Sequence, residues 1–324
     1  MPSESPTLLV FCIPIFNDWE CAVALLEQID QMAAQSKLDA AVLFIDDGSS
    51  SAWPTPWPAG VTTLKWAKVL QLRRNLGHQR AIAIGLTYIH VNIPCKAVVV
   101  MDGDGEDAPA DVPKLLAEFE TRREQKVIFA QRAKRSESLT FRVFYRLYQS
   151  AHKLLTGRRV EVGNFSIIPA KTLARLVGVG ELWNHYAASV FKARLPHAKI
   201  PIARGHRLVG TSRMNFSNLV VHGLSAISVF GEEIGVRLLI AASVLIALTL
   251  AGLAAVIAIR FGTTLAVPGW ATNAVGLLLV LFGNGLLLSL VFIFIILQTR
   301  SAMTFLPLRD YEHYVLDLAS VVPQ

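Results

Sequence analysis

The sequence has only three cysteines in 324 residues, Cys12, Cys21 and Cys95, and no two of them are spaced as Cys-x-x-Cys. This low, odd count argues against a disulfide framework and against a structural zinc site, and it is typical of a reducing compartment. A cleavable signal peptide is not expected either, because the first ten residues, MPSESPTLLV, are polar and then strand-like.

Charge is missing from two long apolar runs, 238–259 and 274–297. A helix needs roughly 20 apolar residues to cross a bilayer. We therefore expect a two-helix transmembrane domain at 236–297 rather than two buried helices of a soluble core. The linker between the runs contains a single basic residue, Arg260, and the flanking segments are more basic. Since positive residues favour the cytoplasmic side, we expect both flanks in the cytoplasm and the protein in the inner (plasma) membrane.

Acidic residues are outnumbered, with 24 Asp and Glu against 31 Lys and Arg, which gives a net charge of +7. Nucleic acid, anionic lipid or a phosphorylated substrate would each suit this excess. No nucleic-acid-binding motif is present, so nucleic acid is not expected as a partner. Residues 139–155 have aromatic and basic side chains at helical spacing, which suits a membrane surface or an ordinary surface helix packed on a sheet. Residues 214–235 look like a second amphipathic segment that leads to the membrane.

Strand-like and helix-like patterns alternate through the first 170 residues. The strands are expected at 8–16, 41–47, 68–74, 96–102 and 126–132. The helices between them are expected near 18–35, 78–90 and 111–124. Alternation of this kind predicts an α/β fold with a mostly parallel sheet and helices on both faces. In such sheets ligands bind beyond the carboxyl ends of the strands.

A dense group of acids, Asp102, Asp104 and Glu106, follows the fourth predicted strand. In extended backbone their alternation would put all three on one side. Three carboxylates so close raise each other's pKa unless a cation joins them. Mg²⁺ prefers one or two carboxylates together with substrate phosphates, so the group predicts a metal and a phosphorylated ligand. A calcium loop is excluded, because its sixth and twelfth positions would be Asp107 and Pro113. An acidic loop that merely caps the next helix remains an alternative.

Further polar residues follow the second and third predicted strands. Asp46 and Asp47 precede Gly48, which permits a tight turn. A carboxylate there can bind a ribose or a base edge. The segment RRNLGHQR, 73–80, then leads into a helix whose N-terminus favours an anion. His78 in this segment is a candidate general base, although a surface or phosphate-contacting role is the simpler interpretation.

Taken in order, these motifs resemble family 2 glycosyltransferases of the GT-A fold, in the branch that makes polyprenyl-phosphate sugars. Pro-x-Tyr-Asn-Glu of the family resembles Pro14 to Asp18, and Val-Asp-Asp-Gly-Ser resembles Ile45 to Ser49. Asn-x-Gly-Lys appears as Asn75 to His78, and Met-Asp-Ala-Asp-Leu-Gln-Asp-Pro-Pro resembles Met101 to Pro109. Phe-Arg-Ile-Phe resembles Phe141 to Phe144, and Gly-x-Ser-Lys resembles Gly210 to Arg213. The resemblance covers nearly the whole chain.

The resemblance implies roles for individual residues. The donor nucleotide-sugar would be bound by Pro14, Phe16, Asp18, Asp47, Asp102 and Gly103. The metal, Mg²⁺ or Mn²⁺, would be held by Asp102, Asp104 and Glu106, with Asp104 also counted as catalytic. The phosphate of the acceptor lipid would be held by Arg132 and Arg142, and Arg213 would complete the positive site.

Two departures from the family pattern affect the predicted site. Asp18 replaces Glu and keeps the charge. Gly-Asp-Phe-Arg of the family appears as Gly163-Asn164-Phe165-Ser166, so both its acid and its base are lost. The segment 181–196, which contains Trp183, has no counterpart in the family motifs and is a candidate wall of the sugar pocket.

The implied function is inverting transfer of a sugar from a UDP- or GDP-linked donor to a polyprenyl phosphate, such as undecaprenyl phosphate, at the cytoplasmic membrane face. Membrane lipid and a second copy of the chain are expected partners. The implied organisation is a cytoplasmic GT-A domain at 1–213, a juxtamembrane segment at 214–235, the two spans, and a cytoplasmic tail at 298–324. A processive polysaccharide synthase, a different lipid acceptor and a non-catalytic membrane-anchored subunit stay open as alternatives.

Overall fold

The protein was analysed as a computed structural model, which describes residues 6–51, 53–54, 60–132, 149–150, 153–157, 162–203, 205, 207–210, 223–263, 269–301 and 305–322. They form two compact units. One unit consists of the chain up to 138, 160–229 and the residues from 304 onwards, and the other consists of 139–159 and 230–303.

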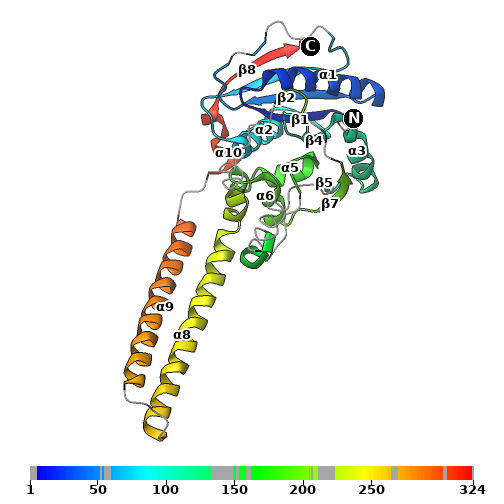
Figure 1. Cartoon of the computed structure of the whole chain (residues 1–324). Coiled ribbons are helices and arrows are strands. Elements are labelled where there is room, and N and C mark those ends of the chain that lie inside the picture. The colour runs from blue at the N-terminus through cyan, green and yellow to red at the C-terminus, as the bar shows by residue number, and fades with distance from the viewer. Residues whose placement is uncertain are drawn as a thin grey trace. The chain divides into compact units, whose positions relative to one another are not determined.

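The first unit is built on one eight-stranded sheet with the order β7-β5-β6-β4-β1-β2-β3-β8 (Figure 1). The strands are β1 (Leu9–Ile15), β2 (Ala40–Asp46), β3 (Ala67–Leu72), β4 (Ala97–Val100), β5 (Val127–Arg132), β6 (Ser166–Pro169), β7 (His197–Ile202) and β8 (Val315–Val322). Strands β1 to β4 are parallel neighbours, β5 is parallel to β7, and β6 and β8 run antiparallel to the strands beside them.

Helices cover both faces of this sheet. The α-helices of the first unit include α1 (Trp19–Ser36), α2 (His78–Asn92), α3 (Val112–Thr121), α5 (Ala170–Leu176), α6 (Tyr186–Lys192) and α10 (Pro307–Asp310), and its short 3-10 helices include η1 (Pro109–Asp111), η2 (Gly180–Trp183) and η3 (Tyr311–Tyr314). Along β1, Leu9, Phe11 and Ile13 enter a core with α1 and α3. Val10 and Cys12 enter a second core with α2, α5 and α6. The alternation follows from the two-residue period of a strand, and the predicted α/β sheet with helices on both faces is confirmed.

The C-terminal segment differs from the expected tail. Residues Val315–Val322 form β8, which pairs antiparallel with β3 along the edge of the sheet. Tyr311 of η3 is buried in the same core as Leu70 and Leu72 of β3. The expectation of a tail over 298–324 is therefore wrong for this segment, because its apolar residues supply the edge strand and part of the core.

The second unit contains two long helices, α8 (Gly231–Gly262) and α9 (Trp270–Ser301). Both are long and apolar enough to cross a membrane, with mean hydropathies of 2.6 and 2.7 in their best windows. Only 17% and 6% of those windows is buried, unlike the core helix of a soluble domain. The helices pack as an antiparallel pair at glycines: a Cβ on Gly235 would lie 2.7 Å from Ile296, and one on Gly285 would lie 2.8 Å from Ile246. Small residues permit such close helix contacts in membranes.

Helix α8 begins inside the segment that the sequence predicted to be juxtamembrane, since 231–235 are already helical. The predicted amphipathic helix over 139–155 lies mostly outside the described residues. Of its described residues, Leu154 accepts a hydrogen bond on its carbonyl oxygen from Nη1 of Arg237 at 2.8 Å.

Candidate functional site

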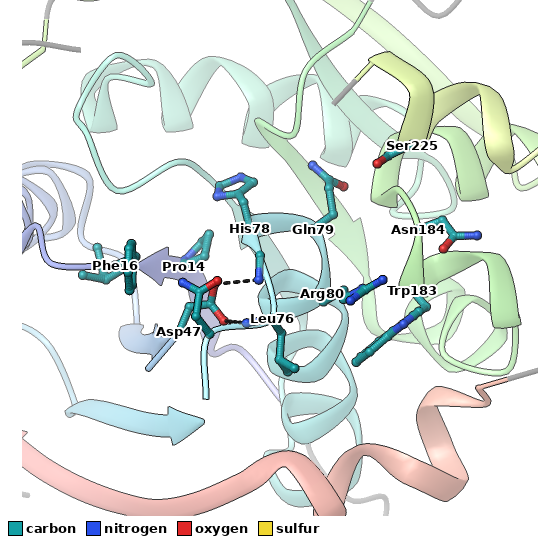
Figure 2. Close-up of a pocket in the computed structure, with 13 residues that line it drawn as sticks. Pro14, Phe16, Asp47, Leu76, His78, Gln79, Arg80, Trp183, Asn184 and Ser225 are labelled. Carbon is teal, nitrogen blue, oxygen red and sulfur yellow. Dashed lines mark hydrogen bonds between the residues drawn. The ribbon is translucent and has the colours of Figure 1, made fainter. Parts of the chain in front are cut away.

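A cavity of about 600 Å³ lies beyond the carboxyl ends of the central strands (Figure 2). Its walls come from the end of β1, the loop after β2, the start of α2 and the η2 region. The lining residues are Pro14, Ile15, Phe16, Asp47, Asn75, Leu76, Gly77, His78, Gln79, Arg80, Trp183, Asn184 and Ser225. Three of the predicted donor-binding residues, Pro14, Phe16 and Asp47, are therefore brought together. The parallel arrangement of β1 and β2 explains this, because it places their carboxyl ends at the same edge.

Asp47 holds the cavity wall together. Its two carboxylate oxygens accept hydrogen bonds from the backbone N–H groups of Leu76 at 2.7 Å and Gly77 at 2.9 Å (Figure 2). Burial raises the pKa of this carboxyl, and the two N–H donors only partly oppose the rise. The residue thus fixes the loop that leads into α2, a role that the sequence did not indicate.

Gly48 allows two loops to meet beside this carboxylate. Its φ of +71° lies in the left-handed region, and an added Cβ would lie 2.5 Å from the backbone nitrogen of Asn75. We expect Gly48→Ala to destabilise the first unit by about 2 kcal/mol or more, from backbone strain and the collision with main-chain atoms. Thermal unfolding of the purified full chain measures the loss. Gly60→Ala is the matched control, because no atom of the described residues lies within 4 Å of a Cβ at that position. Equal unfolding temperatures for the two variants would contradict this account.

Phe16 is the most exposed aromatic residue of the cavity wall, with 47% of its surface accessible. It follows β1, and the next residue, Asn17, has a φ of +51°. The side-chain oxygen of Asn17 accepts hydrogen bonds from the backbone N–H groups of Ser50 and Ser51 at 2.8 and 3.1 Å. The chain therefore turns sharply after Phe16, and the aromatic ring stays at the cavity, where a planar base could stack on it.

The acidic loop after β4 does not have the extended geometry that the sequence suggested. The strand ends at Val100, and residues 103–107 form turns and bends in which Gly105 has a φ of +81°. The backbone N–H of Glu106 donates to Oδ1 of Asp104 at 3.0 Å, and Glu106 is only 9% exposed. Among the described residues no group of three or more His, Cys, Asp or Glu side chains is placed to hold a metal ion. The expectation that Asp102, Asp104 and Glu106 lie on one side is corrected, because the loop folds back on itself.

Gly103 permits close contact between this loop and the end of β1. A Cβ at Gly103 would lie 2.3 Å from Cδ1 of Ile15 and 2.9 Å from the carbonyl oxygen of Pro14. Ile15 and Pro14 both line the cavity. The acidic loop is consequently packed against the cavity wall, although Gly103 itself lines no part of the cavity.

Arg207 neutralises two of the predicted acids and was missed by the sequence reasoning. Its guanidinium forms a salt bridge with Asp18 at 2.5 Å and lies 4.0 Å from Oδ2 of Asp104. Burial alone would lower its pKa, but the hydrogen bond and charge of Asp18 outweigh burial and raise it. The segment is also bonded to the loop by its backbone, since N–H of Leu208 donates to the carbonyl of Asp104 at 3.1 Å. No motif signals Arg207, because its partners lie far away in the sequence.

A polar network joins the cavity wall to the acidic loop. Nε2 of His78 lies 3.0 Å from Oδ1 of Asp102, and Nδ2 of Asn164 donates to the same oxygen at 3.1 Å. Nε2 of Gln79 donates to Oδ1 of Asn164 at 3.1 Å. Burial tends to lower the pKa of His78, but the charge and hydrogen bond of Asp102, together with the charges of Asp104 and Asp47, outweigh burial and raise the pKa. Of the four, His78 and Gln79 line the cavity, and the network ties them to the first acid of the loop.

The far wall of the cavity is aromatic and basic. Trp183 and Asn184 line it, as the unassigned segment 181–196 had suggested, whereas His185 and Tyr186 are buried. The guanidinium carbon of Arg80 lies 5.0 Å from the centroid of the Trp183 ring (Figure 2). Phe305 lies against the same ring, with 3.8 Å between the centroids. The residues after α9 thus support a wall of the cavity.

The structure does not describe the side chains that were predicted to hold the phosphate of the acceptor lipid. Arg132 is the last residue of β5, and its side chain lies outside the described residues. Arg142 and Arg213 also lie outside the described residues. Their roles stay predictions.

Comparison with known proteins shows similarity to one family and to several named relatives. The family described as glycosyl transferase family 2 matches residues 10–176. YkcC, an uncharacterised glycosyltransferase of Bacillus subtilis (strain 168), is 22% identical over 226 residues, 68% of each chain. Undecaprenyl-phosphate 4-deoxy-4-formamido-L-arabinose transferase of Erwinia tasmaniensis is 26% identical over 117 residues, 36% of this chain and 35% of that relative. Dodecaprenyl-phosphate galacturonate synthase of Rhizobium johnstonii is 27% identical over 135 residues, 41% of this chain and 38% of that relative.

The alignments with the last two relatives span little more than a third of those relatives' length. The family match is broader. It runs from β1 to the end of α5 and includes the loops after β1, β2 and β4 that build the cavity and the acidic turn. Since this match covers more than half of the 324 residues, the chain belongs to glycosyl transferase family 2.

Proposed function

We propose that the protein transfers a sugar from a nucleotide-sugar donor to a polyprenyl phosphate at the cytoplasmic face of the plasma membrane. The observation that carries this proposal is the combination, in one chain, of the cavity beside the Asp102–Asp104 loop with two helices long and apolar enough to cross a membrane. The named activities of two relatives, which act on undecaprenyl and dodecaprenyl phosphate, support the choice of acceptor.

The cavity would hold the donor. A volume of about 600 Å³ falls within the usual range for small-molecule sites. The base of UDP or GDP would stack on Phe16 next to Pro14, and Asp47 would fix the loop that borders the ribose. The diphosphate would then extend toward the N-terminus of α2, where backbone N–H groups favour an anion. The sugar would lie near His78, Gln79 and Trp183.

The acidic loop fits a divalent cation with two protein ligands better than one with three. Asp102 and Asp104 are partly exposed, with 24% and 30% of their side chains accessible, whereas Glu106 is buried. Mg²⁺ takes one or two carboxylates and completes its shell with substrate phosphates and water. Asp102 and Asp104 would therefore hold Mg²⁺ or Mn²⁺, which when bound neutralises charge on the departing nucleotide diphosphate.

The acceptor would need little activation. A phosphate monoester has its second pKa near 6, so it is largely dianionic at neutral pH and needs no strong general base. Its oxygen would attack the anomeric carbon from the side opposite the nucleotide, whose C–O bond electrons leave with the diphosphate, and the configuration inverts. The main task of the protein is to bring two polyanions together. Arg132, Arg142 and Arg213 would orient the attacking phosphate, since guanidinium groups bind phosphate without losing their charge.

The membrane would supply the lipid acceptor. Helices α8 and α9 would anchor the protein in the bilayer, with the segments before and after them in the cytoplasm. Membrane lipid is then a partner, and a second copy of the chain can associate through the apolar helices. The prenyl tail would remain in the lipid phase while its phosphate reaches the transferase domain.

A direct assay tests this function. We expect the purified full-length chain, with undecaprenyl phosphate, Mg²⁺ or Mn²⁺ and a panel of UDP- and GDP-sugars, to yield a lipid heavier by one sugar residue. Mass spectrometry of the extracted lipid reads the product, and EDTA should remove it. Nucleotide-sugar binding with no transfer to any lipid would favour a non-catalytic subunit. Extension to many sugar residues would favour a polysaccharide synthase.

A further inference from the structure

The network at the cavity wall has a fixed donor and acceptor order. The backbone N–H of Tyr186 donates to Oε1 of Gln79 at 2.7 Å. Because a backbone N–H can only donate, the oxygen of the Gln79 amide must face Tyr186 and its nitrogen must face Asn164. The Gln79 nitrogen then donates to Oδ1 of Asn164, which leaves the Asn164 nitrogen pointing at Asp102.

His78 completes this arrangement. Its Nε2 lies 3.0 Å from Oδ1 of Asp102 and 3.0 Å from Nδ2 of Asn164. The three atoms lie about 3 Å from one another, so His78 and Asn164 both reach the same carboxylate oxygen of Asp102. A carboxylate accepts only, so it selects the form of His78 that carries a hydrogen on Nε2. Asp102 is thus held by an amide donor and an imidazole donor at once.

The backbone of Asn164 is also held in place by a hydrogen bond. Its backbone carbonyl accepts a hydrogen bond from Oγ of Ser166 at 2.8 Å, and the same Oγ lies 2.8 Å from the hydroxyl of Tyr186. Asn164 is 5% exposed, and Ser166 and Tyr186 are fully buried. Since both ends of Asn164 are bonded to rigid, buried groups, the amide nitrogen has little freedom to move away from Asp102.

Both residues depart from the motifs that the sequence otherwise resembles. Those motifs place Lys at position 78 and Asp at position 164. An Asp at 164 would put a second carboxylate about 3 Å from Asp102, and two carboxylates that close cannot both stay ionised without a cation. A Lys at 78 would supply that cation. Here a neutral amide and an imidazole stand in the same two places, and they touch each other and Asp102.

We propose that His78 and Asn164 are a matched pair of positioning residues that fix the Asp102 carboxylate by two converging hydrogen bonds, so that neither can be exchanged without the other. The expected effect on kcat rests on the proposed transferase function. The expected effect on the unfolding temperature rests only on the contacts among His78, Asn164 and Asp102. The pair orients the carboxylate of Asp102, the first acid of the loop. His78 and Gln79, which belong to the same hydrogen-bond network, also line the cavity.

A swap of both residues tests the pairing in the full-length chain. Asn164→Asp alone is expected to lower kcat by about tenfold or more, the usual cost of losing a group that orients a ligand-binding carboxylate. His78→Lys alone is expected to lose a similar factor. The double variant H78K/N164D should recover to within about threefold of the unmodified protein, whereas independent effects would multiply to about a hundredfold loss. The KM for the lipid acceptor should change little throughout, because the pair acts on the acidic loop.

Thermal unfolding without metal or substrate provides a second measurement that does not need activity. N164D should lower the unfolding temperature by about 3 °C or more, from carboxylate repulsion, and the double variant should regain it. Asn184→Asp is the matched control. Asn184 also lines the cavity, but it directly follows η2 and lies outside the hydrogen-bond network around Asp102. Rescue of N184D by H78K would reveal a general charge effect and overturn the pairing, as would additive losses in both measurements. The two proposals can fail separately. If the double variant regains stability but the unmodified protein transfers no sugar, the proposed function is refuted and the pairing of His78 with Asn164 is retained.

Discussion

Asp104→Asn is expected to reduce sugar transfer by about 100- to 1000-fold, a loss typical of removing one group that stabilises charge in a transition state. The substitution preserves the shape of the loop, because an amide oxygen can still accept the hydrogen bond that the Glu106 N–H donates to Oδ1. It removes the negative charge that faces Arg207 and that would hold a divalent cation. Sugar transfer to undecaprenyl phosphate, followed by mass spectrometry over a range of Mn²⁺ concentrations, measures the effect.

The control for this substitution is Asp39→Asn. Asp39 immediately precedes β2 and pairs on the surface with Lys65 at 3.2 Å, at the opposite end of the strand from the cavity. We expect transfer by D39N to stay within about twofold of the unmodified protein, as for most surface changes. Retention of more than a tenth of the activity by D104N would show that the acidic loop does not carry the chemistry assigned to it.

Removal of the residues after 304 is expected to unfold the transferase domain rather than trim a tail. The deletion would take away β8, which pairs with β3 from Ala67 to Leu72, and the buried Tyr311. Each large apolar side chain that loses its buried environment costs about 1.5–3 kcal/mol. Three or more such losses approach the 5–15 kcal/mol that keeps a typical domain folded. Limited proteolysis and thermal unfolding of the shortened chain in detergent measure the outcome.

Two point variants separate a packing effect from a length effect. Tyr311→Ala should destabilise the domain by about 3 kcal/mol, as for other large aromatic residues in cores. Leu316→Ala, in β8 but 57% exposed, should cost less than about 0.5 kcal/mol. A shortened chain that unfolds at the same temperature as the full chain would mean that β8 contributes nothing, and the pairing with β3 would be incidental.

The elements with strong periodicity were predictable from sequence. Helix α1 was expected at 18–35 and is found at Trp19–Ser36, because Leu25, Leu26 and Ile29 recur at helical spacing on its buried face. The first four strands end within two residues of their predicted ends. Their ends place Pro14, Phe16 and Asp47 around the cavity, so this part of the site followed from the alternation of strands and helices.

The remainder depended on pairings between distant segments. Strand β6 lies between β4 and β5 and runs against both, although the chain reaches it only after β5. The salt bridge from Arg207 to Asp18 joins residues 189 positions apart. Local patterns carry no information on such partners. The acidic loop was misjudged for a different reason: the alternation of its acids suggested extended backbone, but Gly105 adopts a left-handed conformation in a turn that buries Glu106.

The position of β8 in the chain has a consequence for biosynthesis. This strand emerges from the ribosome only after α8 and α9 have been made, yet it completes the edge of a sheet whose other strands were all made before those helices. The nascent domain therefore waits, with the β3 edge uncovered, until both long helices have been made. Completion of the sheet is thereby tied to synthesis past α9, and a ribosome that stalls within α9 releases a chain that lacks the strand paired with β3.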